Sequence, residues 1–207
     1  MKRLWSLLAL VLLQIAQPCV LAEVTNPASG EVTGAKMTVH PDWFKESFLD
    51  IGEDVSEAAD AGKHVILFME MNGCPYCYKM NEENFKHAPY KDFIQEHFEV
   101  IALNVKGDRE VALNAETSLT EKALAQRLKV TYTPTVLFLN GENKTVARIN
   151  GYRSVGDFKQ VLDYVEEKAY LNTTLASYIN ERKQGGYAFR DHPQLKETDN
   201  LQALAQR

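Results

Sequence analysis

The sequence predicts an α/β fold in which helices flank a central mixed β-sheet. Two observations support this prediction. Segments whose apolar residues recur at helical spacing alternate with short, fully apolar runs that are typical of buried strands. The Asn-Gly turn at 140–141 joins two strand patterns as a hairpin, so we expect the sheet to contain an antiparallel pair.

The composition is that of an ordinary globular protein. The chain has 207 residues, of which 45% are hydrophobic and 25% charged, so collagen-like structure and wholesale disorder are excluded. This length predicts one domain with flanking segments, or two small domains at most. The net charge of −5, with no run of Lys or Arg, argues against nucleic-acid binding. Three cysteines are too few for a disulfide-stapled scaffold or a four-thiolate metal site.

Residues 1–22 have the pattern of a cleaved signal peptide. A basic start at residues 1–3 precedes a short apolar run, and Val20-Leu21-Ala22 forms a cleavage site. The apolar run is much shorter than the roughly 20 residues of a membrane span, so an uncleaved anchor is the less favoured alternative. Cleavage would remove Cys19 and leave one cysteine pair in an exported, potentially oxidising compartment.

The first part of the mature chain predicts a linker, a helix and a strand. Residues 23–40 are polar, contain Gly and Pro, and show no sustained period, so we expect a linker. Helical spacing begins after Pro41, with Asp42 as the expected N-cap and Gly62 as the stop. Residues 64–69 form a buried-strand pattern. The expected apolar face of the helix comprises Phe44, Phe48, Ile51, Val55, Ala58 and Ala59.

A helical pattern and a second strand follow. The helical spacing extends from Pro75 to about residue 98, and Pro89 predicts a kink. Residues 99–105 are rich in Val, Ile and Leu and predict a strand. Residues 106–119 are polar and irregular, and Thr120 opens the next helix.

The remaining elements complete an α-β-α-β-α-β-β-α order. Strand patterns cover 136–139 and 145–149, and Ser154 with Asp157 resembles a capping pair that opens a helix. Residues 171–207 predict a C-terminal extension, with one further helix and then a polar tail that we do not assign to any structure. The further helix is expected over about 172–183.

Cys74-Pro75-Tyr76-Cys77 lies where a predicted strand ends and a helix begins. The first N–H groups of a helix lack partners and carry partial positive charge, so they stabilise a thiolate there. We therefore expect Cys74 to be the exposed, attacking thiolate. Cys77 follows nearly one turn later and can close a ring with Cys74, which is the chemistry of thiol–disulfide exchange.

Two other roles remain open for the cysteine pair. It could be a fixed structural disulfide or two inert buried thiols. Copper(I) could also use the thiolates together with nearby thioethers, the candidates being Met69, Met71 and Met80. A zinc site is disfavoured because the histidines show no paired spacing, and we predict no metal.

At this point the sequence resembles the thioredoxin superfamily. The resemblance rests on the Cys-Pro-Tyr-Cys motif, on Thr133-Pro134-Thr135 before a strand, and on Gly151 before a helix. It covers residues 41–170, which we take as one thioredoxin-like domain. Several segments resemble more narrowly the SoxW-type thioredoxin-like proteins exported by bacteria, which implies a periplasmic location. These segments are 72–77, 96–98, 107–111, 133–135 and 150–152.

The resemblance implies roles for four further residues around the cysteines. Pro134 would be cis and lie against the cysteine pair, and Thr133 would offer its backbone to an extended substrate strand. Gly151 would allow close approach on the other side, and Tyr76 would face partners. The alternative interpretations are that Pro134 simply starts a strand, that Gly151 is a turn glycine, and that Tyr76 is a surface residue of the motif.

One position departs from the thioredoxin pattern. Thioredoxins carry a buried Asp in the strand before the motif, and this chain has Phe68 there, six residues before Cys74. Glu70 lies on the same strand face and is a possible proton shuttle in its place. A solvated acid at a strand end is the alternative.

The sequence as a whole predicts an exported thiol–disulfide oxidoreductase. Its redox group would be the Cys74–Cys77 disulfide, with no separate cofactor, and its substrates would be protein disulfides. The resemblance implies the reducing direction and electrons from a membrane thiol relay, and we expect a monomer. A disulfide oxidant of the same fold, or a non-enzymatic copper-binding or scaffold protein, remains the alternative.

Overall fold

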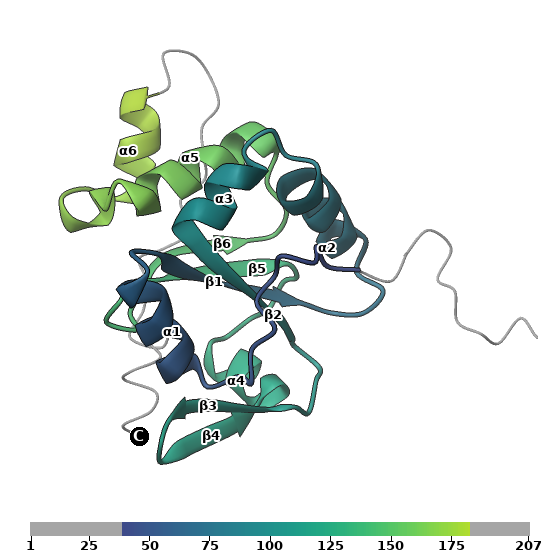
Figure 1. The fold of residues 1–207 in the computed structure, drawn as a ribbon. Helices are drawn as coiled ribbons and strands as arrows, with labels where there is room; N and C mark the ends of the chain where they lie inside the picture. Colours follow the sequence, from purple (N-terminus) through teal and green to yellow (C-terminus); the bar gives the residue numbers. More distant parts are fainter. Residues whose placement is uncertain (1–38, 183–207) are drawn as a thin grey trace, which may run out of the picture. The chain divides into compact units, whose positions relative to one another are not determined.

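A computed structural model describes residues 39–182 of the chain (Figure 1). The predicted signal peptide over 1–22, most of the predicted linker over 23–40 and the polar tail after residue 182 lie outside the described residues. Within the described part, none of the helices combines the length and the apolar character needed to cross a bilayer.

Four strands form the central sheet in the order β2-β1-β5-β6. Strand β1 (His64–Glu70) pairs in parallel with β2 (Phe98–Asn104) and antiparallel with β5 (Thr135–Leu139). Strand β6 (Thr145–Asn150) continues antiparallel from β5 through the turn that the Asn-Gly dipeptide predicts. The prediction of a mixed sheet is therefore confirmed.

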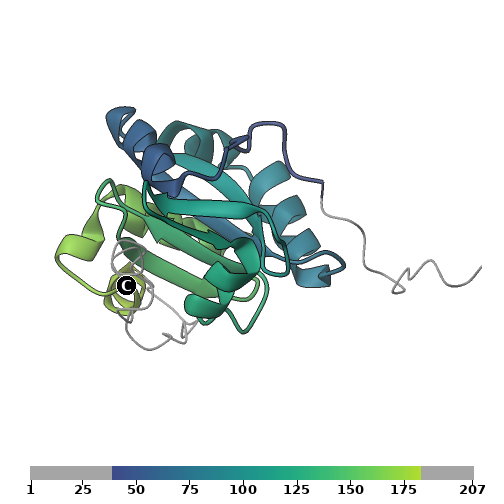
Figure 2. The same cartoon turned by 90° about the horizontal axis from the view of Figure 1, so that it is seen from below.

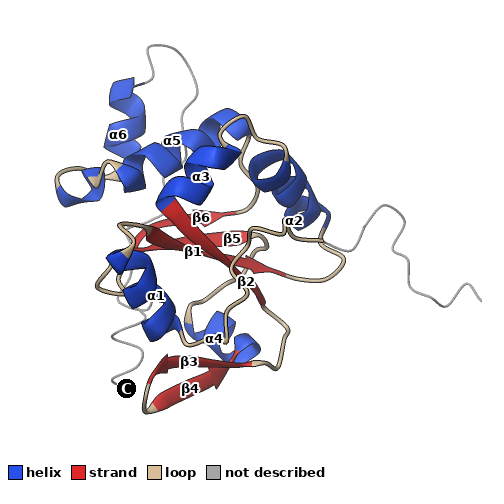
Figure 3. Cartoon of the chain, viewed as in Figure 1, coloured by secondary structure: helices blue, strands red, loops and turns tan. Residues whose placement is uncertain are grey.

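Helices cover both faces of this sheet (Figures 1 and 3). On one face an aliphatic core contains the odd-numbered side chains of β1 from Val65 to Met69. On the other face an aromatic-rich core contains Phe68 and both cysteines of the motif. The aliphatic core is covered by α1 (Ile51–Asp60) and α4 (Glu121–Arg127), and the aromatic core by α2 (Pro75–Met80), the π-helix η1 (Asn81–Lys86), α3 (Lys91–His97) and α5 (Val155–Glu166).

The first helix begins later than predicted. Asp42 is not its N-cap; α1 begins at Ile51, and Asp50 accepts a hydrogen bond from the Glu53 N–H at 3.0 Å. Residues 41–49 instead form an irregular segment that runs across the domain before it enters α1 (Figure 2).

Backbone pairing explains this difference. The Lys45 N–H donates to the carbonyl of Val100 on β2 at 2.8 Å, so this part of the segment is bonded to the sheet edge. Phe44 is buried in the aromatic core, whereas Phe48 is 102% exposed. The prediction that Phe44 and Phe48 belong to the apolar face of the first helix is therefore wrong, although their spacing is helical.

Residues 106–119, predicted to be irregular, contain a β-hairpin. Strand β3 (Glu110–Asn114) pairs antiparallel with β4 (Thr117–Thr120) as a separate two-stranded sheet. Val111 and Leu113 alternate with more exposed residues and pack into the aliphatic core. The strand is five residues long, too short for its alternation to stand out from the polar sequence around it.

An ion pair between an exposed arginine and a buried carboxylate holds this hairpin beside β2. The carboxylate of Glu121 is almost fully buried and accepts from Arg109 Nη2 at 2.6 Å and from the Asn104 N–H at 2.7 Å. Arg109 Nη2 also donates to the carbonyl of Ala102 at 3.2 Å. Gly107 leaves room for the carboxylate, since a Cβ there would lie 2.0 Å from Glu121 Oε2. Segment 107–111 thus has a structural role.

The C-terminal extension begins as predicted with a further helix. A 3-10 turn, η2 (Ala169–Leu171), precedes α6 (Leu175–Arg182). The helix starts later than expected because Thr174 caps it, accepting from the Ser177 N–H at 3.1 Å. Tyr178 is buried and lies edge-on to Tyr164 of α5 with ring centroids 5.3 Å apart, so α6 packs on the domain.

His64 at the start of β1 makes the fold sensitive to acid. Burial, with smaller contributions from the charges of Lys168 and His97, lowers the pKa of His64 to about 4. A histidine in the unfolded chain titrates near pH 6.5, so the unfolded state binds the proton more readily. The resulting stability is fully present above about pH 6.5 and is lost as the pH falls toward 4.

We expect the free energy of unfolding to fall by roughly 1–2 kcal/mol between pH 7 and pH 5 because of this histidine alone. Urea unfolding of the wild type and of His64→Phe at both pH values measures it. The variant should show a fall that is smaller by this amount. An equal fall in both proteins would assign the acid sensitivity to other groups.

Candidate active site

The cysteine pair forms a disulfide at the start of α2. Strand β1 ends at Glu70, and a turn with Gly73 at φ 74° leads into the motif. Cys74 is the N-cap of α2, with Pro75 in the first turn, and the two Cα atoms of the disulfide are 5.2 Å apart. The Cys77 N–H points at Cys74 Sγ at 3.1 Å. The strand–turn–helix placement predicted from sequence is therefore observed.

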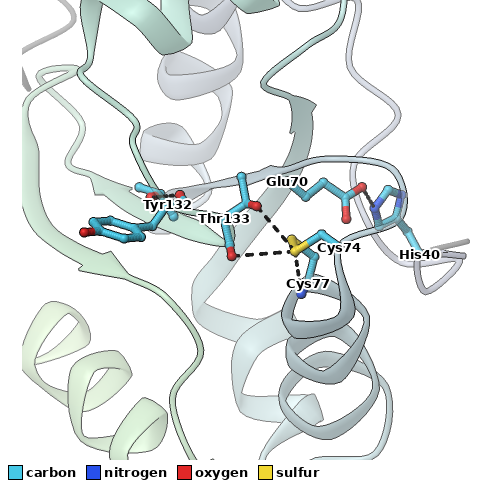
Figure 4. Close-up of a disulfide and its surroundings, with 7 residues drawn as sticks. His40, Glu70, Cys74, Cys77, Tyr132 and Thr133 are labelled. Atoms are coloured by element: carbon cyan, nitrogen blue, oxygen red, sulfur yellow. Dashed lines mark hydrogen bonds and ion pairs between the residues drawn. A yellow bond between two sulfur atoms is a disulfide. The ribbon is translucent and has the colours of Figure 1, made fainter. Parts of the chain in front are cut away.

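Neither cysteine is freely exposed in this disulfide-bonded form. Cys74 is 3% exposed and Cys77 is 0% exposed. The expectation of an exposed Cys74 is thus wrong for the oxidised chain, although the order of the two residues is the expected one. The reason is Thr133, whose carbonyl oxygen lies 3.6 Å and whose hydroxyl oxygen lies 3.4 Å from Cys74 Sγ (Figure 4).

The loop before β5 lies against the disulfide, as the resemblance implies. The Thr133–Pro134 peptide bond is cis. The Gly151 N–H donates to the Pro134 carbonyl at 2.7 Å, and Gly151 has a φ of 80°, a conformation that favours glycine. A Cβ at Gly151 would meet nothing within 4 Å, so the space beside this loop is open. Among the described residues, the Thr133 N–H has no hydrogen-bond acceptor.

Two exposed tyrosines are sequence neighbours of the site residues. Tyr76 lies between the cysteines and is 62% exposed. Tyr132 directly precedes Thr133 and is 64% exposed, and its ring extends away from the cysteines (Figure 4). Sequence reasoning identified Tyr76 and missed Tyr132, although its position next to the Thr-Pro element was a usable signal.

Glu70 is buried and paired, so it is not a solvated acid at a strand end. Its Oε1 lies 2.6 Å from His40 Nε2, and its buried Oε2 has no hydrogen-bond partner among the described residues. His40 belongs to the segment predicted as a linker, yet its ring stacks on Phe44 at 5.3 Å. Phe68, at the position of the thioredoxin Asp, is fully buried in the core.

A second polar group links the Gly151 loop to the helix of the motif. The Tyr152 hydroxyl donates to the Glu83 carboxylate, and the ammonium of Lys79 lies 4.5 Å from the centre of the Tyr152 ring. Burial and the neighbouring Glu83 raise the pKa of Tyr152 to about 12, so this phenol stays protonated at neutral pH. The contact holds the loop after β6 against α2 and η1.

The geometry does not support a copper site built from the three methionines. Met69 packs into the aliphatic core on one face of the sheet, whereas Met71 and Met80 lie with the cysteines on the other face. Met71 lies beyond the end of β1, where the alternation of the strand no longer applies, and it packs on the opposite face from Met69, so the three thioethers do not converge. Across residues 39–182 there is also no group of three His, Cys, Asp or Glu side chains placed to hold a metal ion.

The Thr133 hydroxyl is positioned to stabilise the reduced Cys74. A hydrogen bond of this kind is worth about 0.5–1.5 kcal/mol. We therefore expect Thr133→Val to slow alkylation of reduced Cys74 by iodoacetamide at pH 7 about two- to ten-fold. Mass spectrometry of the alkylated peptide measures the rate, and Thr131→Val, at an exposed neighbouring position, is the matched control. Equal rates in both variants would contradict a role for the hydroxyl.

Comparisons with known proteins agree with this geometry. A family profile described as a thioredoxin-like domain matches residues 51–166. A thioredoxin-fold protein from Helicobacter pylori is 24% identical, with 66% of this chain and 97% of that chain aligned at a TM-score of 0.52. A thioredoxin from Thermus thermophilus is 26% identical over 56% of this chain and 83% of that chain, at a TM-score of 0.43. No curated protein matches.

The matched region contains the sheet, the disulfide and the Thr133–Pro134 loop, and it covers more than half of the sequence. The strand order and the helices on both faces are those of the fold predicted from the motifs. The chain belongs to the thioredoxin-like domain family.

Proposed function

We propose that the protein is a thiol–disulfide oxidoreductase that acts on the disulfides of other proteins. The observation that carries this proposal is the Cys74–Cys77 disulfide at the start of α2, with Thr133 in contact with Cys74. A purely structural disulfide needs neither an unpaired backbone donor nor open space beside it. This disulfide has both features of a binding site, because the Thr133 N–H is an unpaired donor and the space next to Gly151 is open.

The residues account for each step of the exchange. In the reduced protein the Cys74 thiolate is stabilised by the start of α2, by the Cys77 N–H and by the Thr133 hydroxyl. It attacks one sulfur of the substrate disulfide, and the other substrate sulfur leaves as a thiolate and takes up a proton. Cys77 then attacks Cys74, which releases the second substrate thiol and closes the disulfide seen in the structure.

The site fits an extended polypeptide next to the substrate cysteine. Thr133 precedes β5, which pairs with neighbouring strands only from Thr135 onward, so its N–H is free to pair with an added strand. The exposed rings of Tyr76, between the two cysteines, and of Tyr132, directly before Thr133, supply apolar contact surface next to the site.

We also propose a location and a direction. The signal-peptide pattern over residues 1–22 and the resemblance to SoxW-type proteins support export to the periplasm. The same resemblance supports reduction of substrates with electrons from a membrane thiol relay, and we propose that the protein acts as a monomer. The redox group is the disulfide itself, so the reaction requires no further cofactor.

Insulin reduction by the full chain in the presence of dithiothreitol tests the activity. We expect turbidity from the wild type and only the background rate from Cys74→Ser. Equal rates in the two proteins would overturn the proposal.

The reduction potential of the Cys74–Cys77 pair tests the direction. Reduction is supported by a potential near that of thioredoxin, about −270 mV. A value near about −120 mV, as in a strong oxidant, would instead assign the protein to disulfide formation.

A further inference from the structure

The residue after the cis proline lies behind the loop that contacts the disulfide. Thr135 begins β5 and is 0% exposed. It pairs with Met69 of β1, which packs in the aliphatic core, so the Thr135 side chain is on the face of the sheet opposite to Cys74. From that face its hydroxyl donates to the Tyr132 carbonyl, with the two oxygens 2.8 Å apart. The hydroxyl thus holds the loop from the side away from the cysteine pair.

Neighbouring side chains leave the Thr135 hydroxyl proton available for this bond. The side-chain oxygen of Asn150, the cross-strand partner of Thr135, lies 3.3 Å from the same hydroxyl oxygen. Arg148 Nε already donates to this Asn150 oxygen at 3.0 Å. A hydroxyl has one proton to donate, and the Tyr132 carbonyl is the nearer of the two acceptors. The proton of Thr135 is therefore committed to the Tyr132 carbonyl.

One peptide group joins this bond to the substrate side of the loop. The Tyr132 carbonyl and the Thr133 N–H belong to the same peptide group, next to the disulfide (Figure 4). This group is trans, since the cis bond of the described loop is the following one, between Thr133 and Pro134. In a trans peptide the N–H points away from the carbonyl oxygen. Because Thr135 holds the carbonyl, the Thr133 N–H is turned to the opposite side, where it has no acceptor among the described residues.

The loop is also fixed on both sides of this peptide group. At its start, Arg148 Nη1 donates at 2.8 Å to the carbonyl of Leu128, the C-cap of α4. At its end, the Gly151 N–H donates to the Pro134 carbonyl at 2.7 Å. The ends of the loop therefore stay in place without the Thr135 hydroxyl, and the hydroxyl sets the direction of one peptide group between them.

We propose that Thr135 is a positioning residue for substrate binding, whose hydroxyl aims the Thr133 N–H at a backbone carbonyl of an extended substrate chain. The inference rests on the proposed function. The same bond polarises the peptide group, because a carbonyl that accepts a hydrogen bond makes the N–H of its peptide a stronger donor. Since Thr135 lies on the face opposite to the reacting sulfurs, it acts on binding and not on the exchange step. A bond to the substrate backbone adds affinity whatever the substrate side chains are.

Two substrates test this role in the full chain. Insulin offers a backbone beside its disulfides, whereas 5,5′-dithiobis(2-nitrobenzoate) has none. With insulin and dithiothreitol, we expect Thr135→Val to raise KM about three- to ten-fold, the effect of one lost hydrogen bond, and to leave kcat within about two-fold. The first thionitrobenzoate release, by Cys74, should stay within about two-fold of the wild type. Thr135→Ser keeps the hydroxyl and should bring the insulin KM to within about two-fold of the wild type. Thr174→Val, which removes a hydroxyl that caps α6, is the matched control and should change neither reaction.

The outcomes separate the two proposals. An unchanged insulin KM in Thr135→Val, an equal slowing of both reactions, or a Thr135→Ser variant as impaired as Thr135→Val would overturn the role of Thr135. If Thr135→Val does not fold, amide hydrogen exchange in a mixed disulfide of Cys77→Ser with the insulin B chain decides. The Thr133 amide should exchange at least about ten-fold more slowly there than in free Cys77→Ser, and equal exchange would overturn the proposal. A wild type that fails to reduce insulin would instead contradict the proposed function, whatever the variants do.

Discussion

Cys77→Ser is expected to stop the reaction at a covalent complex between Cys74 and its substrate. Cys77 is fully buried behind Cys74, so its loss leaves the attacking sulfur in place and removes the intramolecular release step. The effective concentration of a well-placed neighbouring group exceeds that of a millimolar external thiol by far more than a hundred-fold. Turnover should therefore fall by roughly a hundred-fold or more.

The trapped complexes should appear as bands on non-reducing gels that disappear on addition of dithiothreitol. Mass spectrometry of these bands would identify the substrates and the cysteine to which they are joined. The matched control is Cys74→Ser, which retains Cys77 and should form few adducts because Cys77 is inaccessible. Adducts of equal amount on both variants would show that the two cysteines do not have separate roles.

Phe85→Ala should have the largest effect on stability. Phe85 of η1 is fully buried, and its ring meets Phe44 at 5.1 Å, Phe68 at 5.3 Å and Phe158 at 5.5 Å. Truncation of a buried Phe to Ala removes apolar surface and leaves a cavity, which costs about 3–5 kcal/mol. Urea unfolding followed by circular dichroism measures the change in the free energy of unfolding.

Phe48→Ala is the matched control for this prediction, because the Phe48 side chain is fully exposed. A substitution at such a surface site should change the free energy of unfolding by no more than about 0.5 kcal/mol. Similar losses in the two variants would show that the aromatic cluster around η1 does not carry the stability assigned to it.

Features that depend on a few neighbouring residues were predicted correctly from the sequence. Thr120 and Ser154 are the N-caps of α4 and α5, each accepting from the N–H three residues ahead. The sequence pattern predicted all four strands of the central sheet. Strands β1 and β5 are buried throughout and form apolar runs, whereas β6 alternates buried and half-buried residues after the Asn-Gly turn. The Cys-Pro-Tyr-Cys motif also lies at the predicted strand-to-helix junction.

Features that depend on contacts between distant residues were missed or misplaced. The segment around Lys45 is not helical because its backbone is bonded to β2, more than fifty residues later in the chain. Val111 and Leu113 form a strand because the aliphatic core receives them, not because the local sequence is strongly strand-like. The His40–Glu70 contact joins residues thirty positions apart, and no local pattern reveals such a pair.

The contacts along the outer edge of β2 have a consequence for how the protein behaves at high concentration. Lys45 donates to one β2 carbonyl, Arg109 donates to another, and Glu121 accepts from the Asn104 N–H. An edge strand with unpaired backbone groups is a template for sheet-to-sheet association between molecules. Because these groups are already bonded within the chain, a second molecule cannot extend the sheet on this side without first breaking them, which protects the folded protein against aggregation through β2.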